Sequence, residues 1–535
     1  MNALHINGND LTFEDLRQVV YERRPVLLLP EARAAAERAR AVVESHLDDE
    51  RPSYAVTTGV GKLSDVRIAP DQILQLQVNL VRSHSVGVGE PLTEAETRAM
   101  MLLRANSLAK GFSGVRPQVI DTLCEMLNRG VHPIIPSQGS VGASGDLAPL
   151  AHLALVLIGE GEAVYSPQTK GKKARRTGES GEGGRMSGAD ALRHAEITLL
   201  VLEAKEAISL INGTQAMLAV GALSLLAAET LVDSADVIAS LSLDALRGTD
   251  VAFDPRIQAV RPHAGQIQSA ENMRRLLEGS QIRESHRDCK RVQDAYSLRC
   301  IPQVHGAVRD TLAFVRHTLE TEMNSAVDNP LVFALPKKVG APKTDFSGDA
   351  PGGEILSGGN FHGEPLAFAL DYLAIVMSAI AGISERRIER MVNPSLSEGL
   401  PAFLAPDAGV NSGFMMAQVT AAALASENKV LAHPASVDSI TTSGNKEDYV
   451  SMGMTAALKL RRVLQNTRNV LAIEAIAAAQ ALEFLKPLLP SKRGQQAIAA
   501  IRAVSAPIDH DRVFAPEFVK VADAIGSGAL AAALM

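Results

Sequence analysis

Aromatic side chains are scarce in this sequence, which has no tryptophan and only six tyrosines among its 535 residues. Sites that stack nucleic-acid bases or sugar rings depend on such side chains, so their scarcity argues against both kinds of site. Neither sign of charge is in large excess, because 53 basic and 60 acidic residues give a net charge of −7. This balance argues against nucleic acid or an anionic membrane as the main partner.

Cysteines are also few, and the three that are present have no paired spacing: Cys124, Cys289 and Cys300. An odd, unpaired set argues against a disulfide framework and favours a reducing compartment. The first residues lack the basic-then-apolar pattern of a secretory signal, and apolar runs such as residues 373–377 are too short to span a membrane. We therefore expect a cytoplasmic protein without a membrane segment.

Stretches rich in alanine and leucine dominate the rest of the chain and are typical of α-helices. Thr12 is expected to cap a first helix, and Pro30 to begin a second. Further helices are expected over residues 71–106, 117–128, 203–233, 305–324, 362–392, 413–432 and 460–482. Strand signals are sparse. The sequence therefore predicts a mainly α protein with a bundle of long helices at its centre.

Two segments depart from this pattern. Residues 166–187 combine six lysines and arginines with five glycines and contain almost no apolar side chains, so they are expected to be a mobile insertion, and residues 337–354 a second one. We expect two domains. Residues 1–205 would form a smaller mixed N-terminal domain, and residues 206–535 the long-helix bundle with a C-terminal helical region.

The most informative run is Gly-Ser-Val-Gly-Ala-Ser-Gly-Asp-Leu-Ala-Pro-Leu-Ala-His at residues 139–152. A purely structural interpretation is a glycine-rich turn capped by Asp146 at the next helix. A nucleophile elbow needs glycine two residues after the serine, but Asp146 follows Ser144 at that spacing. A phosphate-binding loop needs a lysine that is absent here.

The residue types at positions 143–145 fit an internal ring closure. If the amide nitrogen of Gly145 attacks the carbonyl carbon of Ala143 and water is lost, a five-membered imidazolone forms. Loss of the Ser144 hydroxyl as a second water then leaves an exocyclic methylene. The small side chains of Ala143 and Gly145 minimise crowding, and Ser144 supplies the β-hydroxyl that must leave. The product is an electrophilic alkene made without a metal or an external cofactor.

This run resembles the signature of the aromatic amino acid lyase family, whose ammonia-lyases use a 4-methylidene-imidazol-5-one group formed autocatalytically from such a tripeptide. Further similar blocks spread the resemblance over residues 10–520, at positions 54–61, 83–90, 211–215, 293–300, 358–362 and 426–429. The resemblance implies a carbon–nitrogen lyase of the ammonia-lyase fold. It also implies a homotetramer whose sites are lined by more than one subunit and act on a small amino acid.

The family's functional residues match five positions that concern the amino acid backbone and the proton transfer. Arg299 would hold the substrate carboxylate, because a guanidinium makes two charge-assisted hydrogen bonds to it. Tyr54 resembles the tyrosine proposed to remove the β-proton, and a free phenol, with a pKa of about 10, needs positive surroundings for that role. Asn212 and Tyr296 would orient and polarise the imidazolone, and Gln293 would lie near the substrate.

Three further positions concern the substrate side chain. The pair Ser83-His84 suits an imidazole that must be hydrogen-bonded, Glu427 would add an acceptor or a base, and Phe361 would pack on the substrate. A histidine at position 84 also suits a phenol, but the block around Glu427 is most similar to the histidine-specific members of the family. We expect conversion of L-histidine to trans-urocanate and ammonia, the first step of histidine degradation.

Two alternatives stay open. One is another activity of the same family, a tyrosine or phenylalanine ammonia-lyase or an aminomutase. The other is a non-catalytic helical scaffold, against which the intact tripeptide, Tyr54 and Arg299 argue. A metal site is not expected, because His286 and Cys289 have no second pair of ligands at metal spacing.

Overall fold

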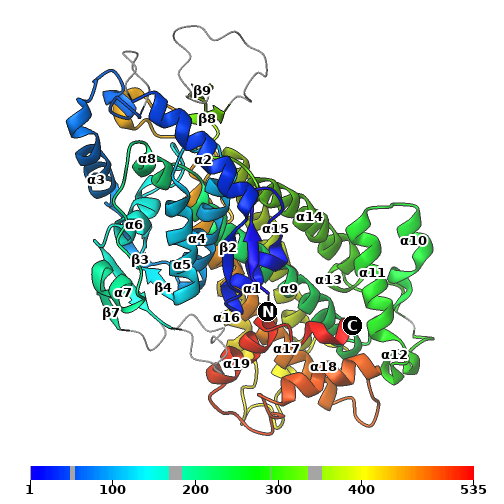
Figure 1. Ribbon diagram of the computed structural model, residues 1–535. Coiled ribbons are helices and arrows are strands. Elements are labelled where there is room, and N and C mark those ends of the chain that lie inside the picture. The colour runs from blue at the N-terminus through cyan, green and yellow to red at the C-terminus, as the bar shows by residue number, and fades with distance from the viewer. Residues whose placement is uncertain (1, 48–54, 168–183, 290, 335–351) are drawn as a thin grey trace. The chain divides into compact units, whose positions relative to one another are not determined.

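The structure is a computed structural model that describes residues 2–47, 55–167, 184–289, 291–334 and 352–535. Within these ranges it contains nineteen α-helices and nine strands of three or four residues (Figure 1). The predicted mainly α class is therefore confirmed.

Contacts between residues divide the chain into two compact units, each built from three segments. Unit 1 comprises residues 1–223, 317–368 and 435–457, and unit 2 comprises residues 224–316, 369–434 and 458–535. Four of the five boundaries fall within long helices, α9 (Gln215–Ala245), α14 (Ile301–Met323), α15 (Glu364–Val392) and α17 (Gly453–Glu483), and the fifth lies between residues 434 and 435. The domain boundary predicted at residue 205 stays a prediction.

Unit 1 holds all the strands of the described chain together with helices of 6 to 16 residues and the start of α9. Thr12 caps its first helix in a capping box with Asp15, and Pro30 occupies the first turn of the second, as expected. The elements are β1 (Leu4–Ile6), α1 (Phe13–Tyr21), β2 (Val26–Leu28), α2 (Pro30–Ser45), α3 (Ile73–His84), β3 (Val88–Pro91), α4 (Glu94–Ala109), α5 (Pro117–Arg129), β4 (Val131–Pro133), β5 (Pro136–Gln138), α6 (Leu147–Leu157), β6 (Glu162–Tyr165), β7 (Arg185–Ser187), α7 (Gly188–His194), α8 (Glu206–Ile211), the start of α9, β8 (Leu331–Ala334) and β9 (Gly353–Leu356).

The strands form small sheets. β1 pairs with β2 in parallel, and β3–β5, β4–β6–β7 and β8–β9 are antiparallel. Most of the two predicted insertions, at residues 168–183 and 335–351, lies outside the described residues. The C-terminal ends of both predicted insertions are ordered strands rather than mobile segments. Residues 185–187 form β7, which pairs with β6, and residues 353–354 belong to β9, which pairs with β8.

Two predicted helices are interrupted. The helix expected over residues 71–106 is α3 and α4 separated by β3, where Gly89 has a φ of +85° that favours glycine. The helix expected over residues 203–233 is α8 and α9, separated at Asn212, Gly213 and Thr214. Gly213, with a φ of +148°, allows this second break.

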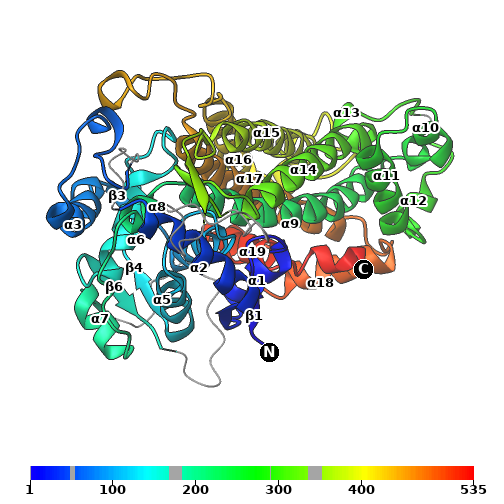
Figure 2. The same ribbon diagram turned by 45° about the horizontal axis from the view of Figure 1, so that its top comes forward.

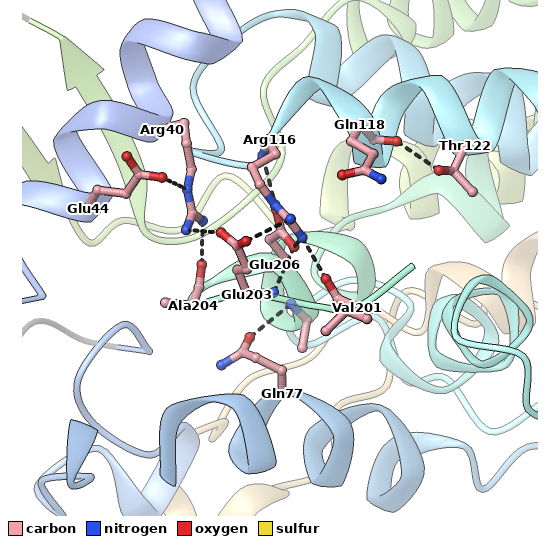
Figure 3. A network of polar contacts seen from close by, with 11 residues as sticks. Arg40, Glu44, Gln77, Arg116, Gln118, Thr122, Val201, Glu203, Ala204 and Glu206 are labelled. Carbon is pink, nitrogen blue, oxygen red and sulfur yellow. Dashed lines mark hydrogen bonds and ion pairs between the residues drawn. The ribbon is translucent and has the colours of Figure 1, made fainter. Parts of the chain in front are cut away.

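A polar network anchors the chain just before α8 (Figure 3). The carboxylate of Glu206, whose side chain is fully buried, accepts hydrogen bonds from the guanidinium of Arg116 at 2.7 and 2.8 Å. Glu203 pairs with Arg116 at 2.7 Å and with Arg40 of α2 at 2.8 Å. Because ion pairs on a buried carboxylate are screened little by water, the network fixes the start of α8 and hence the position of Asn212 at its end.

Unit 2 is a bundle of long helices (Figure 2). Its elements are most of α9 (Gln215–Ala245), α10 (Pro255–Ala259), α11 (Ala264–Leu277), α12 (Gln281–Ser285), α13 (Tyr296–Arg299), most of α14 (Ile301–Met323), α15 (Glu364–Val392), α16 (Met415–Leu431), α17 (Gly453–Glu483), α18 (Lys492–Arg502) and α19 (Ala515–Gly526). The fully buried Glu474 of α17 accepts hydrogen bonds from Ser242 of α9 and Arg387 of α15. The long helices are thus joined by polar contacts as well as by apolar packing.

Two of these helices contain apolar stretches that are longer than the sequence analysis expected. By length and composition, α9 and α15 could each cross a membrane, with mean hydropathies of 1.6 and 2.0 in their most apolar windows. Within the structure 72% and 56% of these windows is buried. Burial of this extent is typical of the core helices of a bundle.

A buried carboxyl group in unit 2 predicts a pH effect on stability. Burial raises the pKa of Asp244 from 3.8 to about 7, although Ser280 donates to both of its oxygens at 2.9 Å. Between these values the folded state holds a proton that the unfolded chain has lost, so stability falls as the pH rises through this window. We expect the free energy of unfolding to drop by about 3 kcal/mol from about pH 5 to about pH 8 through this group alone.

The Asp244→Asn variant, which cannot ionise, isolates this contribution. Urea unfolding at both pH values should show a smaller loss of stability in the variant than in the wild type. Equal losses in the two proteins would contradict the prediction.

Candidate active site

The turn from Ser140 to Asp146 lies in unit 1 and reverses the chain tightly. Gly142 and Gly145 both have a φ of +72°, a conformation that side chains disfavour. A Cβ atom on Gly145 would lie 2.2 Å from the carbonyl oxygen of Gly213, which accepts a hydrogen bond from Asp146 N at 2.7 Å. Glycine at position 145 is therefore required by close backbone approach as well as by φ.

Asp146 holds this turn against the start of α9. Its fully buried carboxylate accepts hydrogen bonds from Ser140 Oγ at 2.7 Å and from Met217 N at 2.8 Å. Burial raises the pKa of Asp146 to about 6. The purely structural interpretation placed its side chain as the cap of the next helix, α6, but α6 has no side-chain cap bond. Asp146 instead binds a backbone N–H in the first turn of α9.

The hydroxyl of Ser144 meets a distant carboxylate. Ser144 Oγ donates a hydrogen bond to Glu447 Oε1 at 2.7 Å, although the two residues are 303 positions apart. The residues after Glu447 follow the turn: Met452 N donates to the carbonyl oxygen of Val141 at 2.9 Å, and Ser451 Oγ to that of Gly142 at 3.2 Å. Glu447, Ser451 and Met452 thus line one side of the tripeptide's surroundings.

Asn212 is buried beside the same turn. It ends α8 with extended dihedral angles and is followed by Gly213, which pairs with Gly145 in an isolated bridge. Asn212 Nδ2 donates to the carbonyl oxygen of Asn329 at 3.0 Å, and its own carbonyl oxygen accepts from Arg104 at 2.7 Å. Its Oδ1 atom has no hydrogen-bond partner among the described residues. A buried amide oxygen without a partner is costly, so this atom is available to a bound group.

Two further predicted residues belong to unit 1. His84 is the last residue of α3, and its Nδ1 lies 2.8 Å from the carbonyl oxygen of Leu80. Because a carbonyl oxygen only accepts, Nδ1 carries the proton, and Nε2 of the neutral ring is an acceptor. Phe361 is half-buried in the turn before α15. Two residues later, Gly363 N lies 3.5 Å from the carbonyl oxygen of Gly142, which brings this turn to the tripeptide.

The remaining predicted residues that the structure describes belong to unit 2. Gln293 and Tyr296 are exposed, and the guanidinium carbon of Arg299 lies 4.6 Å from the centre of the Tyr296 ring. Arg299 Nε is buried without a partner in the described chain. Glu427 of α16 accepts a hydrogen bond from Arg462 of α17 at 3.2 Å. Three of these four residues therefore lie in or just before the short helix α13.

Tyr54 lies outside the described residues. Sequence reasoning gave no role to Glu447, Ser451 or Arg104, which the structure places against the tripeptide or Asn212. Glu447 and Ser451 stand in the block Glu-Asp-Tyr-Val-Ser-Met-Gly at residues 447–453, which is not among the blocks that carry the family resemblance in the sequence analysis. Nothing in the sequence around Arg104 distinguishes it from other arginines on helices.

A cavity of about 450 Å³ in unit 2 is lined by Arg275, Lys492 and Arg493 among others, and contains none of the predicted site residues. Within the described ranges no three or more histidine, cysteine, aspartate or glutamate side chains are grouped so that they could hold a metal ion.

Comparison with known proteins identifies close relatives. The family model described as aromatic amino acid lyase matches residues 11–503. The histidine ammonia-lyase of Koribacter versatilis (strain Ellin345) is 68% identical over 534 residues, which are 100% of this chain and 99% of that protein. The solved histidine ammonia-lyase from Trypanosoma cruzi has a TM-score of 0.85 at 40% identity and covers 100% of this chain and 95% of its own. Tyrosine aminomutase from Streptomyces globisporus has a TM-score of 0.87 at 38% identity, covering 99% and 98%.

Proposed function

The chain belongs to the aromatic amino acid lyase family, and on this basis we propose that it converts L-histidine to trans-urocanate and ammonia without oxidation. The observation that carries the reaction type is the turn at residues 142–145, in which Ala143, Ser144 and Gly145 have the residue types and the surroundings that ring closure requires. Full-length similarity to a histidine ammonia-lyase supports histidine as the substrate.

The tripeptide fits a 4-methylidene-imidazol-5-one group on three counts. Gly145 has no side chain to obstruct its nitrogen, and a Cβ atom there would collide with Gly213. The hydroxyl of Ser144 is held by a carboxylate that can exchange a proton with it. The unpartnered Oδ1 of Asn212 lies on the segment that packs on Gly145. When formed, the group supplies an electrophilic alkene to the substrate.

The other residues would bind the substrate and move its protons. Arg299 would hold the carboxylate of the amino acid, and burial of its Nε without a partner favours an incoming anion. Tyr54 would remove the β-proton, and Asn212 and Tyr296 would orient the electrophile. Gln293 would lie near the substrate backbone.

The substrate side chain would be recognised by groups of matching polarity. His84, protonated at Nδ1, presents an acceptor at Nε2 that suits the N–H of an imidazole. Glu427 would accept from the second imidazole nitrogen or act as a base, and Phe361 would pack on the ring. The same acceptor on His84 suits the hydroxyl of a phenol, and this favours tyrosine as the second candidate substrate, in line with the similarity to a tyrosine aminomutase.

A direct assay of two substrates tests the proposal. Incubated with L-histidine, the protein is expected to release ammonia and trans-urocanate, which is followed by its near-ultraviolet absorbance. L-Tyrosine in a matched incubation should give neither coumarate nor a β-amino acid. Turnover of tyrosine without turnover of histidine would overturn the substrate assignment, and no turnover of either would favour a non-catalytic scaffold.

We also propose a cytoplasmic homotetramer with sites shared between subunits. Apolar side chains stay exposed along the long helices of unit 2, including Phe314 of α14, Tyr372 and Ile375 of α15, and Met416 and Val419 of α16. Exposed apolar rows of this kind are typical of subunit interfaces. Light scattering should give four times the chain mass of 56.7 kDa, and a monomeric mass would contradict the assembly.

A further inference from the structure

We infer that Glu447 is a catalytic residue for making the electrophile: its carboxyl group delivers the proton with which the Ser144 hydroxyl leaves as water. This inference rests on the proposed function, since it concerns the formation of the group that the function requires. It assigns a chemical role to a residue that neither binds the amino acid nor belongs to the tripeptide.

The geometry that supports the inference is direct contact with the reacting atom. Glu447 Oε1 lies 2.7 Å from Ser144 Oγ, and the contact is partly buried. Proton transfer between side chains requires hydrogen-bond distance of this kind. Ser144 Oγ makes no other hydrogen bond among the described residues. Glu447 is therefore the group placed to act on the oxygen that leaves.

The loop that carries Glu447 holds its carboxyl group in place. Thr442 Oγ1 donates to Glu447 Oε2 at 2.7 Å, and Thr442 N donates to the carbonyl oxygen of Glu447 at 2.8 Å. Between them Ser443, Gly444 and Asn445 have φ values of +50°, +60° and +67°. Successive left-handed residues cost free energy, and strain of this kind persists where the surrounding contacts impose it. Both carboxylate oxygens are thus engaged, one to be oriented and one to react.

The elimination can be written so that it balances. After ring closure the Cα–H bond of Ser144 breaks, and its electron pair forms the double bond to Cβ. The Cβ–Oγ bond breaks at the same time, and its electron pair leaves with the oxygen. The Glu447 carboxylate, which accepts a hydrogen bond from the Ser144 hydroxyl before the reaction, takes up a proton from solvent and gives it to Oγ, so that water leaves rather than hydroxide. The proton from Cα passes to solvent, so that the protons balance and no co-reactant is consumed.

The full-length chain, made in a cell-free system and sampled over time, tests the inference through its mass rather than its activity. The peptide spanning residues 131–160 of the wild type should lose two waters. In the Glu447→Gln variant the second loss should be slowed by about 10²-fold or more, the usual contribution of a positioned acid. The Asp448→Asn variant, which changes the exposed neighbouring carboxylate, serves as control and should lose both waters at the wild-type rate.

The outcomes separate this inference from the proposed function. A folded Glu447→Gln chain that loses both waters at the wild-type rate overturns the role of Glu447 alone. A wild-type chain that loses no water overturns both. If Glu447→Gln does not fold, as judged by circular dichroism, Thr442→Val decides, because it keeps the carboxyl group and frees only Oε2. A slower second loss in Thr442→Val supports the role, and an unchanged rate contradicts it.

Discussion

Replacing Ser144 by alanine is expected to abolish turnover and leave the fold intact. The substitution removes the hydroxyl that must be lost, so no electrophilic alkene can form, and the rate should fall by a factor on the order of 10³ or more, as when an enzyme loses its reacting group. The structural cost is one partly buried hydrogen bond, to Glu447, or about 1 kcal/mol. Urocanate release, the mass of the 131–160 peptide and the thermal midpoint measure the three effects.

Ser140→Ala provides a matched control in the same turn. Ser140 also makes a hydrogen bond to a carboxylate, that of Asp146, but contributes no atom to the tripeptide. This variant should still lose two waters. Measurable turnover of histidine by Ser144→Ala would refute the electrophile mechanism.

The largest expected loss of stability follows from a buried ion pair beside the active site. Lys205 Nζ lies 2.9 Å from Asp328 Oδ2, and both side chains are almost fully buried. Removing one partner leaves an uncompensated charge in the interior, so Lys205→Met should lower the free energy of unfolding by about 3–5 kcal/mol. Asp328 precedes Asn329, whose carbonyl oxygen holds Asn212. We therefore expect catalytic activity to fall together with stability. Urea unfolding measures the loss of stability.

Comparison with a surface variant and with a double variant tests whether burial causes this loss of stability. Arg82 pairs with Glu160 on the surface of the same unit, with side chains 54% and 37% exposed, so Arg82→Met should cost at most about 1 kcal/mol. The double variant Lys205→Met, Asp328→Asn should recover part of the stability, because neither position of the pair then carries an unpaired buried charge. Equal effects of Lys205→Met and Arg82→Met would show that burial does not decide the contribution of the pair.

Local signals made much of the fold predictable. The cap at Thr12, the proline at position 30 and the glycine after Arg129 act within one turn of helix, so the sequence alone places the helix ends beside them. The break at Asn212 could not be placed in this way. Leu210 and Ile211 precede it and an apolar helical pattern resumes at Ala216. The break depends on Gly213 meeting Gly145 from a different part of the chain.

The residues of the candidate site also divide into those that a local sequence pattern reveals and those that it does not. The tripeptide could be recognised because its chemistry depends on three consecutive residue types. Glu447 could not be assigned, since its contact with Ser144 joins positions 303 apart and no local pattern encodes that distance. For the same reason the purely structural interpretation made the side chain of Asp146 a cap of α6, whereas its partner Met217 lies 71 positions later in the chain. The roles of Gln293, Tyr296, Arg299 and Glu427 rest on resemblance to the family and stay predictions.

The contacts of the 140–146 turn also set an order of events in the cell. The groups that shape it, Gly213, Met217, Ser451 and Glu447, are all translated after it, and the last of them only near the end of synthesis. When the tripeptide of a nascent chain has just left the ribosome, the residues that surround it in the folded protein have not yet been synthesised. The electrophile should therefore form only after residue 451 has been synthesised, and chains truncated before Glu447 should not lose the second water.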